Sequence, residues 1–377
     1  GVQPGRRLRP VSCACGAARR ARRARAACAL APSRSSSSSS SSDGGGGGVG
    51  SGELDGPPLA YEIVRGANVA AADGDGSSKR RAPPPTAVLL HGVLGSRRNL
   101  AGFARQLAAR APDWQFLLVD LRNHGASAEL ARGGAVFDSP HGVASAAQDV
   151  HALLRHLRIF PRALVGHSFG AKVALSMVEL ARPLPLPVQV WALDTAPGPV
   201  APSQFLEQND SPADLIPYLQ SLDMPLPTKE YLTNALISGG FSPAVAAWAA
   251  TNLRESDNGT GLDWLFNLDG VADMYYSYAE TDLWPTLDNL PEGALLNFVK
   301  AERSLHAWGA GEYERMTHAA GRAAGAAAGI FVHTLPDAGH WVHVDNPHGL
   351  IDLMDGLGEA DPAGVPFCEW PKKKFQV

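Results

Sequence analysis

The sequence predicts a doubly wound α/β domain, in which a mostly parallel sheet carries helices on both faces. The 377 residues contain short apolar runs without polar alternation, and segments with helical spacing separate these runs. Strands that are buried on both faces read as continuous apolar runs, and parallel neighbours need a long, usually helical connection. With 45% apolar residues, the chain can bury the sizeable core that such a domain requires.

Each apolar run is expected to form one strand, and each helical pattern one helix. The expected strands cover residues 59–64, 86–90, 114–120, 163–165, 188–193, 295–299 and 330–335. The expected helices of the core cover residues 99–110, 143–157, 169–181 and 350–357. This alternation of strands and helices is typical of a doubly wound sheet.

Residues 199–290 break the alternation. Four helical segments follow one another there with no strand between them, at 212–222, 229–238, 243–253 and 271–281. We interpret them as a helical lid over the carboxyl ends of the strands, where open α/β sheets bind their ligands. The core is therefore expected in two parts, residues 53–198 and 291–358, followed by a C-terminal tail at 359–377.

Residues 1–52 have a composition of their own. Residues 1–42 hold nine arginines, no Asp or Glu, and the serine run 35–42, and a glycine run follows at 44–48. Such a segment cannot bury a core, so we expect a disordered leader with the composition of an organelle transit peptide. The prediction favours the chloroplast over the mitochondrion, and a cytoplasmic location is expected if residues 1–52 are not a genuine leader.

Charge and cysteine content exclude several classes of protein. Without residues 1–42 the chain has 24 Lys and Arg against 37 Asp and Glu, which excludes binding of nucleic acid by charge alone. Only Cys368 lies outside that segment, so no intramolecular disulfide is expected in the body. No stretch of about 18 apolar residues occurs, so no integral membrane segment is expected. The sequence leaves the oligomeric state open.

The pentapeptide Gly166-His167-Ser168-Phe169-Gly170 follows one predicted strand and opens one predicted helix. A sharp strand-to-helix turn holds a serine hydroxyl clear of the sheet, and its flanking positions must be small because the chain folds back on itself. The helix N-terminus next to the hydroxyl favours developing negative charge. The motif therefore predicts that Ser168 is a nucleophile.

An attacking serine needs a general base. His340 follows the last predicted strand, which places it on a loop at the same sheet edge as Ser168. His343 is the nearest competitor, but we expect it to begin the final helical region and to point elsewhere. His91 and His167 are expected to be structural.

The acid that orients the imidazole has two main candidates. Asp194 ends the strand at 188–193, and Glu302 follows the strand at 295–299, where this type of fold more often keeps its acid. An acid from the insertion, such as Asp269, is a third alternative. The residues alone leave the three open, with Asp194 preferred.

An oxyanion hole needs two N–H donors aimed at the developing negative charge. The backbone N–H of Phe169, next to the nucleophile, is expected to be one donor. The second is expected from the glycine-containing loop at 91–95, with Val93 as the preferred residue.

Together these motifs resemble the α/β-hydrolase superfamily across about 59–357. The resemblance rests on His-Gly-Val-Leu-Gly at 91–95, Asp-Leu-Arg-Asn-His-Gly at 120–125, Gly-His-Ser-Phe-Gly at 166–170, Leu-Asp-Thr-Ala-Pro at 193–197 and Ala-Gly-His-Trp-Val-His at 338–343. Within the superfamily, the chain is most similar to a plant branch related to bacterial short-chain esterases and mitochondrial abhydrolase-domain proteins. That resemblance favours Asp194 as the acid. The chain departs from the family pattern at Ala171 and at Ala-Glu-Arg-Ser, 301–304.

The resemblance and the motifs predict a serine hydrolase that cleaves carboxylic esters or related acyl compounds through an acyl-enzyme on Ser168. The expected partner is a small ester or acyl substrate, with no metal, organic cofactor or nucleic acid. Two alternatives are a non-enzymatic small-molecule receptor on the same fold and an acyltransferase.

Overall fold

The computed structural model describes residues 57–69, 82–132, 137–180, 188–200, 210–304, 308, 310–323 and 329–355. The predicted leader at 1–52 and the predicted tail at 359–377 lie outside these residues, so both stay predictions. The same holds for the first residues of the predicted lid, 201–209.

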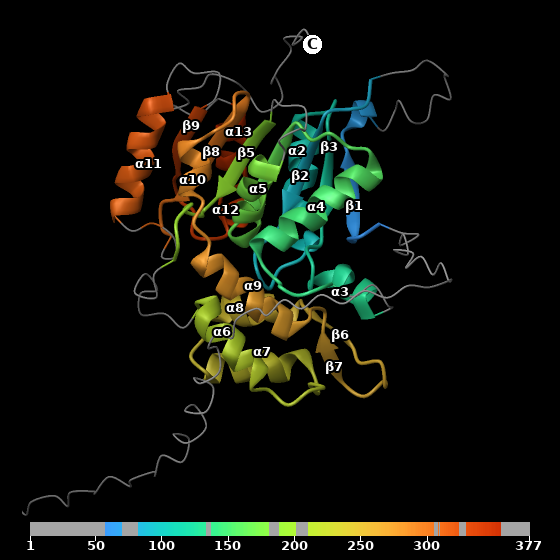
Figure 1. Ribbon diagram of the computed structural model, residues 1–377. Coiled ribbons are helices and arrows are strands. Elements are labelled where there is room, and N and C mark those ends of the chain that lie inside the picture. The colour runs from blue at the N-terminus through green and yellow to red at the C-terminus, as the bar shows by residue number, and fades with distance from the viewer. Residues whose placement is uncertain are drawn as a thin grey trace, which may run out of the picture. The chain divides into compact units, whose positions relative to one another are not determined.

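In the described part of the chain, seven strands form one sheet in the order β1-β3-β2-β4-β5-β8-β9 (Figure 1). β1 is antiparallel to β3, and all other neighbours are parallel. The predicted fold class is therefore confirmed. The strands are β1 (Tyr61–Arg65), β2 (Thr86–Leu90), β3 (Gln115–Val119), β4 (Ala163–His167), β5 (Val188–Leu193), β8 (Ala294–Ala301) and β9 (Gly329–Leu335).

Helices cover both faces of the sheet, each with its own apolar core. On one face, α2 (Arg97–Arg110) and α13 (Pro347–Met354) pack on alternate residues of the strands, such as Leu89. On the other face, α4 (Val143–Leu157) and α5 (Phe169–Leu180) pack on the neighbouring residues, such as Leu90. Alternate strand residues point to opposite faces, which explains why these strands are apolar throughout.

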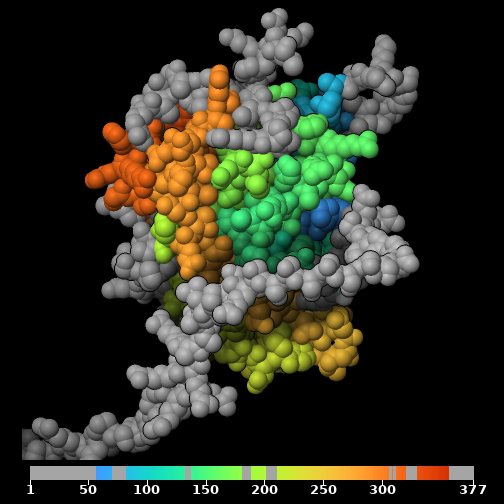
Figure 2. Space-filling model, in the orientation of Figure 1, coloured from blue at the N-terminus to red at the C-terminus, as the bar shows by residue number. Residues whose placement is uncertain are grey.

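The lid forms a separate lobe next to one end of the strands (Figures 1 and 2). Its helices are α6 (Pro212–Gln220), α7 (Lys229–Ser238), α8 (Pro243–Ala250), α9 (Leu268–Glu280) and the short α10 (Trp284–Asp288). Ser211, Thr228, Ser242 and Asn267 cap the first four of these helices with their side chains. The lid is not wholly helical, because β6 (Leu253–Glu255) and β7 (Leu262–Trp264) form a small antiparallel hairpin.

Three helices of the core were not predicted. These are α3 (Gly125–Arg132), α11 (Ala310–Ala323) and the single turn α12 (Val342–Asp345). α11 is rich in alanine and charged residues, and Tyr313 and Met316 are its only large apolar or aromatic side chains, so few positions mark it in the sequence. α12 carries His343 and has a direct bearing on the pocket described below.

Candidate active site

Ser168 occupies the tight turn between β4 and α5. Its backbone has φ 52°, in the left-handed region that strains a non-glycine residue, and its N–H donates to the Leu193 carbonyl at 3.1 Å. A Cβ atom on Gly166 would lie 2.2 Å from the Gly170 oxygen, and one on Gly170 would lie 2.4 Å from the Leu90 oxygen. The flanking glycines are therefore required by contact, as the motif predicted.

Asp194 is the acid that the fold brings to His340. The Nδ1 atom of His340 lies 2.8 Å from Oδ2 of Asp194, whose side chain is fully buried. Asp194 also accepts the backbone N–H of Ala301 at 3.1 Å and the hydroxyl of Ser304. A carboxylate that accepts from several donors is held in one position.

The other two acids lie in different hydrogen bonds. Glu302 accepts the backbone N–H of Asp337 at 2.9 Å, and Asp269 of the lid accepts the Gln220 amide at 2.9 Å. Of the three acids, the recorded His340 contact belongs to Asp194. The departure at 301–304 thus supplies Ser304 as a support for the acid rather than the acid itself, a role that the sequence did not reveal.

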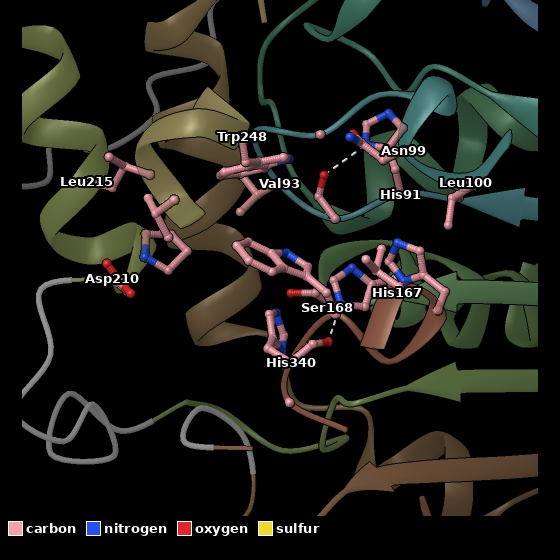
Figure 3. A pocket seen from close by; sticks show the side chains of 18 of the residues that line it. His91, Val93, Asn99, Leu100, His167, Ser168, Asp210, Leu215, Trp248 and His340 are labelled. Atoms are coloured by element: carbon pink, nitrogen blue, oxygen red, sulfur yellow. Dashed lines mark hydrogen bonds between the residues drawn. The ribbon is translucent and has the colours of Figure 1, made fainter. Parts of the chain in front are cut away.

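Ser168 and His340 line the same pocket, and their side chains lie next to one another in Figure 3. The Nε2 atom of His167, which directly precedes Ser168, lies 2.8 Å from the His340 carbonyl oxygen and can donate to it. This contact joins the loop of His340 to the turn of Ser168. Ser168 and His340 are 172 positions apart in the sequence, and this contact brings their segments together at one rim of the sheet.

Val93 and Phe169 both present backbone N–H groups that find no acceptor among the residues the structure describes. The neighbouring Leu94 is held at φ 60° by two contacts: its N–H donates to His124 at 3.0 Å, and its carbonyl accepts from Asn252 of the lid at 3.0 Å. A Cβ atom on Gly92 would lie 3.2 Å from Cβ of Ser168, so this loop lies against the serine. Val93 follows Gly92 and Phe169 follows Ser168, so the two N–H groups belong to the two segments that are in contact here.

Four more histidines surround this centre, and burial keeps their pKa values low. Burial lowers the pKa of His91 to about 4, that of His124 to about 3 and that of His343 to about 4, and it lowers that of His167 well below its ordinary value. They are thus neutral at pH 7. His91 and His124 cross-link loops by accepting backbone N–H groups at 3.0 Å, as expected for structural residues.

The expectation that His343 points elsewhere is wrong. It lies in α12, it is 6% exposed, and it lines the same pocket as Ser168. The sequence placed it at a helix start, but α12 is a single turn that keeps His343 beside His167, with ring centroids 4.9 Å apart.

The pocket has a volume of about 560 Å³ and lies between the lid and the sheet edge. Its lid side is apolar or aromatic, with Leu215, Val245, Trp248, Tyr275 and Tyr278. Trp248 faces Trp341 of the His340 loop, with ring centroids 5.7 Å apart. Among the described residues that line the pocket, none is Lys or Arg. A cavity of this size and composition suits a small apolar ligand.

Lys172 fixes the lid to the core behind the pocket. Its side chain is fully buried on α5, and its ammonium donates to the carbonyls of Gly198, Tyr278 and Thr281 at 2.8, 2.8 and 2.9 Å. Burial lowers the pKa of Lys172 to about 7 and raises the pKa of the Tyr278 phenol to about 12. These lid contacts could not be located from the sequence because they join segments about 100 residues apart.

The described residues lack two further features. No group of three or more His, Cys, Asp or Glu side chains there is arranged to hold a metal ion. Nor does any helix within those residues have the length and apolar character needed to cross a bilayer.

Comparison with known proteins agrees with this geometry. The sn-1-specific diacylglycerol lipase ABHD11 of Mus musculus is 27% identical over 312 residues, which cover 79% of this chain and 84% of the relative. Esterase YbfF of Escherichia coli is 35% identical over 94 residues, 25% of this chain and 33% of the relative. The solved structure of a marine microorganism esterase superimposes with a TM-score of 0.56 at 20% identity, over 77% of this chain and 95% of the other.

The solved structure supports the fold alone. The family assignment rests on the match to a family model. The family model described as the alpha/beta hydrolase family matches residues 87–353, which include β3 to β9, the lid, Ser168 and His340. The chain therefore belongs to the alpha/beta hydrolase family.

Proposed function

We propose that this chain hydrolyses carboxylic esters with Ser168 as nucleophile, His340 as general base and Asp194 as the acid that orients His340. The observation that carries the proposal is the 2.8 Å contact between His340 and the buried Asp194, in the same pocket as the strained Ser168. The lipase and esterase names of the relatives support the ester-hydrolysing function.

The geometry supports a two-step reaction. His340 takes the hydroxyl proton as Ser168 attacks the acyl carbonyl, and Asp194 stabilises the imidazolium that forms. The N–H groups of Val93 and Phe169 hold the oxyanion until the alcohol leaves with the proton from His340. Water, activated by His340, then attacks the acyl-enzyme and releases the acid and free Ser168.

The pocket favours an uncharged acyl group. The lid wall is mostly apolar but includes Asp210, Asp345 is the other acid of the described lining, and that lining holds no Lys or Arg. A carboxylate on the acyl chain would lose its hydration there and meet like charge. We therefore place the acyl chain of a neutral ester against Leu215, Val245 and Trp248.

The proposal is tested with p-nitrophenyl butyrate and a fluorophosphonate probe. The wild-type protein should turn over the ester and carry the probe on Ser168, as identified by mass spectrometry of the modified peptide. Ser168→Ala should lose both properties and keep its Tm, whereas Ser238→Ala, at an exposed serine of α7, should keep both. Turnover retained by Ser168→Ala would refute the assignment.

The same material separates the two alternatives. A receptor would show a ligand-dependent rise of Tm with negligible ester turnover. An acyltransferase would form a new ester when an alcohol is added, so product analysis with added alcohol distinguishes it from a hydrolase. A hydrolase should release the free carboxylic acid as its main product, with or without the added alcohol.

Organelle targeting by residues 1–52 is a separate proposal, supported by the arginine-rich, acid-free composition of residues 1–42. A fusion of residues 1–52 to a fluorescent protein tests it in plant cells. Accumulation in chloroplasts is expected, and diffuse cytoplasmic fluorescence would contradict it.

A further inference from the structure

His343 is a buried polar side chain that the proposed reaction does not use. It is 6% exposed, and neither ring nitrogen has a hydrogen-bond partner among the described residues. Its Nδ1 atom is fully buried and unpaired. An unpaired buried polar group costs free energy, so its presence on the wall of a pocket needs an explanation.

Three other histidines near the pocket form hydrogen bonds through their rings. His91 and His124 each use both nitrogens, and His167 reaches the carbonyl of His340. His343 lies against two rings: the centroid of its imidazole is 4.9 Å from that of His167 and 6.5 Å from that of Phe103. Among His91, His124, His167 and His343, it is therefore His343 whose ring has no hydrogen bond within the described residues.

The chemistry of a neutral imidazole sets what His343 can offer. Burial and the neighbouring His340 keep the His343 ring uncharged at pH 7, so it carries one N–H and one lone pair. A buried N–H without an acceptor is rarer than a buried acceptor without a donor, so the lone pair belongs on the enclosed Nδ1. The N–H then lies on Nε2, the nitrogen that is not enclosed by protein.

The position of His343 distinguishes the two sides of the pocket. Its contact with Phe103 places it beside α2, which also contributes Asn99 to the lining. Figure 3 shows Asn99 on one side of Ser168, and Leu215 and Trp248 of the lid on the other. The Oδ1 atom of Asn99 accepts the N–H of Ser96 at 2.7 Å, which leaves its amide nitrogen as a second donor on the α2 side.

We propose that His343 is a specificity-determining residue that donates a hydrogen bond from Nε2 to an oxygen on the alcohol part of the substrate. The inference rests on the proposed ester hydrolysis, which assigns the apolar lid side to the acyl chain. The substrate class is thereby narrowed to neutral esters whose alcohol carries a hydroxyl or a further oxygen close to the scissile bond.

Two butyrate esters that differ at one group test this proposal. In 2-hydroxyethyl butyrate, a hydroxyl replaces the terminal methyl group of propyl butyrate. The variants are His343→Leu, which removes the donor, and His343→Gln, whose amide nitrogen can lie near the position of Nε2. The measurements are kcat/KM for both esters, the rate of fluorophosphonate labelling and the Tm.

His343→Leu should lower kcat/KM for 2-hydroxyethyl butyrate by about 3- to 10-fold relative to propyl butyrate, the value of one neutral hydrogen bond. The labelling rate should stay within about twofold, because Ser168 and His340 are unchanged, and His343→Gln should restore most of the preference. If Leu destabilises the fold, the ratio of kcat/KM for the two esters on the same protein still reports the donor, because a loss of folded protein lowers both values equally.

Equal losses for both esters would overturn the inference, because they would mean that His343 only supports the position of His340. An unchanged ratio with intact labelling would overturn it as well. If the wild-type protein cleaves neither ester and takes no label on Ser168, the proposed function itself fails, which is a distinguishable result.

Discussion

Replacing Ser304 by alanine should weaken the site without changing Ser168, His340 or Asp194. Asp194 is fully buried and accepts hydrogen bonds from His340, Ala301 and Ser304. Ser304→Ala removes one of these three donors and adds no bulk. The carboxylate would then keep its charge with one lone-pair direction unpaired inside the protein.

The expected loss of stability follows from removing one of the three hydrogen bonds to Asp194. A hydrogen bond to a charged group contributes about 1.5–3 kcal/mol, and an enclosed carboxylate cannot readily replace it with water. The free energy of unfolding should therefore fall by about 1–3 kcal/mol, which corresponds to a decrease in Tm of roughly 2–6 °C in a domain of this size. Because Asp194 would hold His340 less firmly, kcat/KM should fall by about 10-fold.

Thermal unfolding followed by circular dichroism and hydrolysis of p-nitrophenyl butyrate measure the two effects. Ser304→Thr keeps the hydroxyl and should retain most of the activity. Asp194→Asn gives the upper limit for the loss of activity. We expect kcat to fall by about 10⁴-fold, because the amide favours the wrong imidazole tautomer of His340. A Ser304→Ala protein with wild-type Tm and wild-type kcat/KM would refute the reasoning that Ser304 supports the acid.

Two more predictions concern the scaffold around the site. The pKa of Lys172 is lowered by burial from 10.5 to about 7, so between these values the unfolded chain binds more protons than the folded one and stability rises with pH. From pH 7 to pH 9, the unfolding free energy of the wild type should gain about 2 kcal/mol relative to Lys172→Met, measured by urea denaturation; parallel pH curves would contradict this. Gly170→Ala places a Cβ atom 2.4 Å from the Leu90 oxygen and should cost about 3 kcal/mol or more. Gly102→Ala on the exposed face of α2 is the control: its Cβ atom meets nothing within 4 Å, so the change should be neutral or stabilising. Equal Tm values for the two variants would show that the turn around Ser168 tolerates a side chain.

The sheet was predictable because its strands are buried on both faces. β2, α4 and β5 begin and end at the predicted residues, since continuous apolar runs and a clean helical stripe mark them in the sequence. The β6–β7 hairpin was missed because each strand has three residues, too few to show a period. α11 was missed because its alanines and charges are compatible with several structures.

The site was predictable where a motif fixes the backbone and not where side chains meet across the fold. The glycines around Ser168 indicate a turn by their spacing alone, and strand order places His340 and Asp194 at the same rim. Ser304, Lys172 and His343 carry no motif of their own. Their roles depend on distances between loops that the chain order does not set, which explains the incorrect expectation for His343.

The histidine cluster gives this rim polar cross-links without adding charge. His91 and His124 accept backbone N–H groups from Leu121 and Leu94, and burial keeps both imidazoles neutral. A lysine or arginine could donate to carbonyls in these places but could not accept a backbone N–H. It would also put a fixed positive charge near the imidazolium that His340 forms during the reaction, and like charges in a buried site repel strongly. Neutral histidines therefore hold the loop of Val93 in place and leave Asp194, in the proposed reaction, as the group that stabilises the imidazolium of His340.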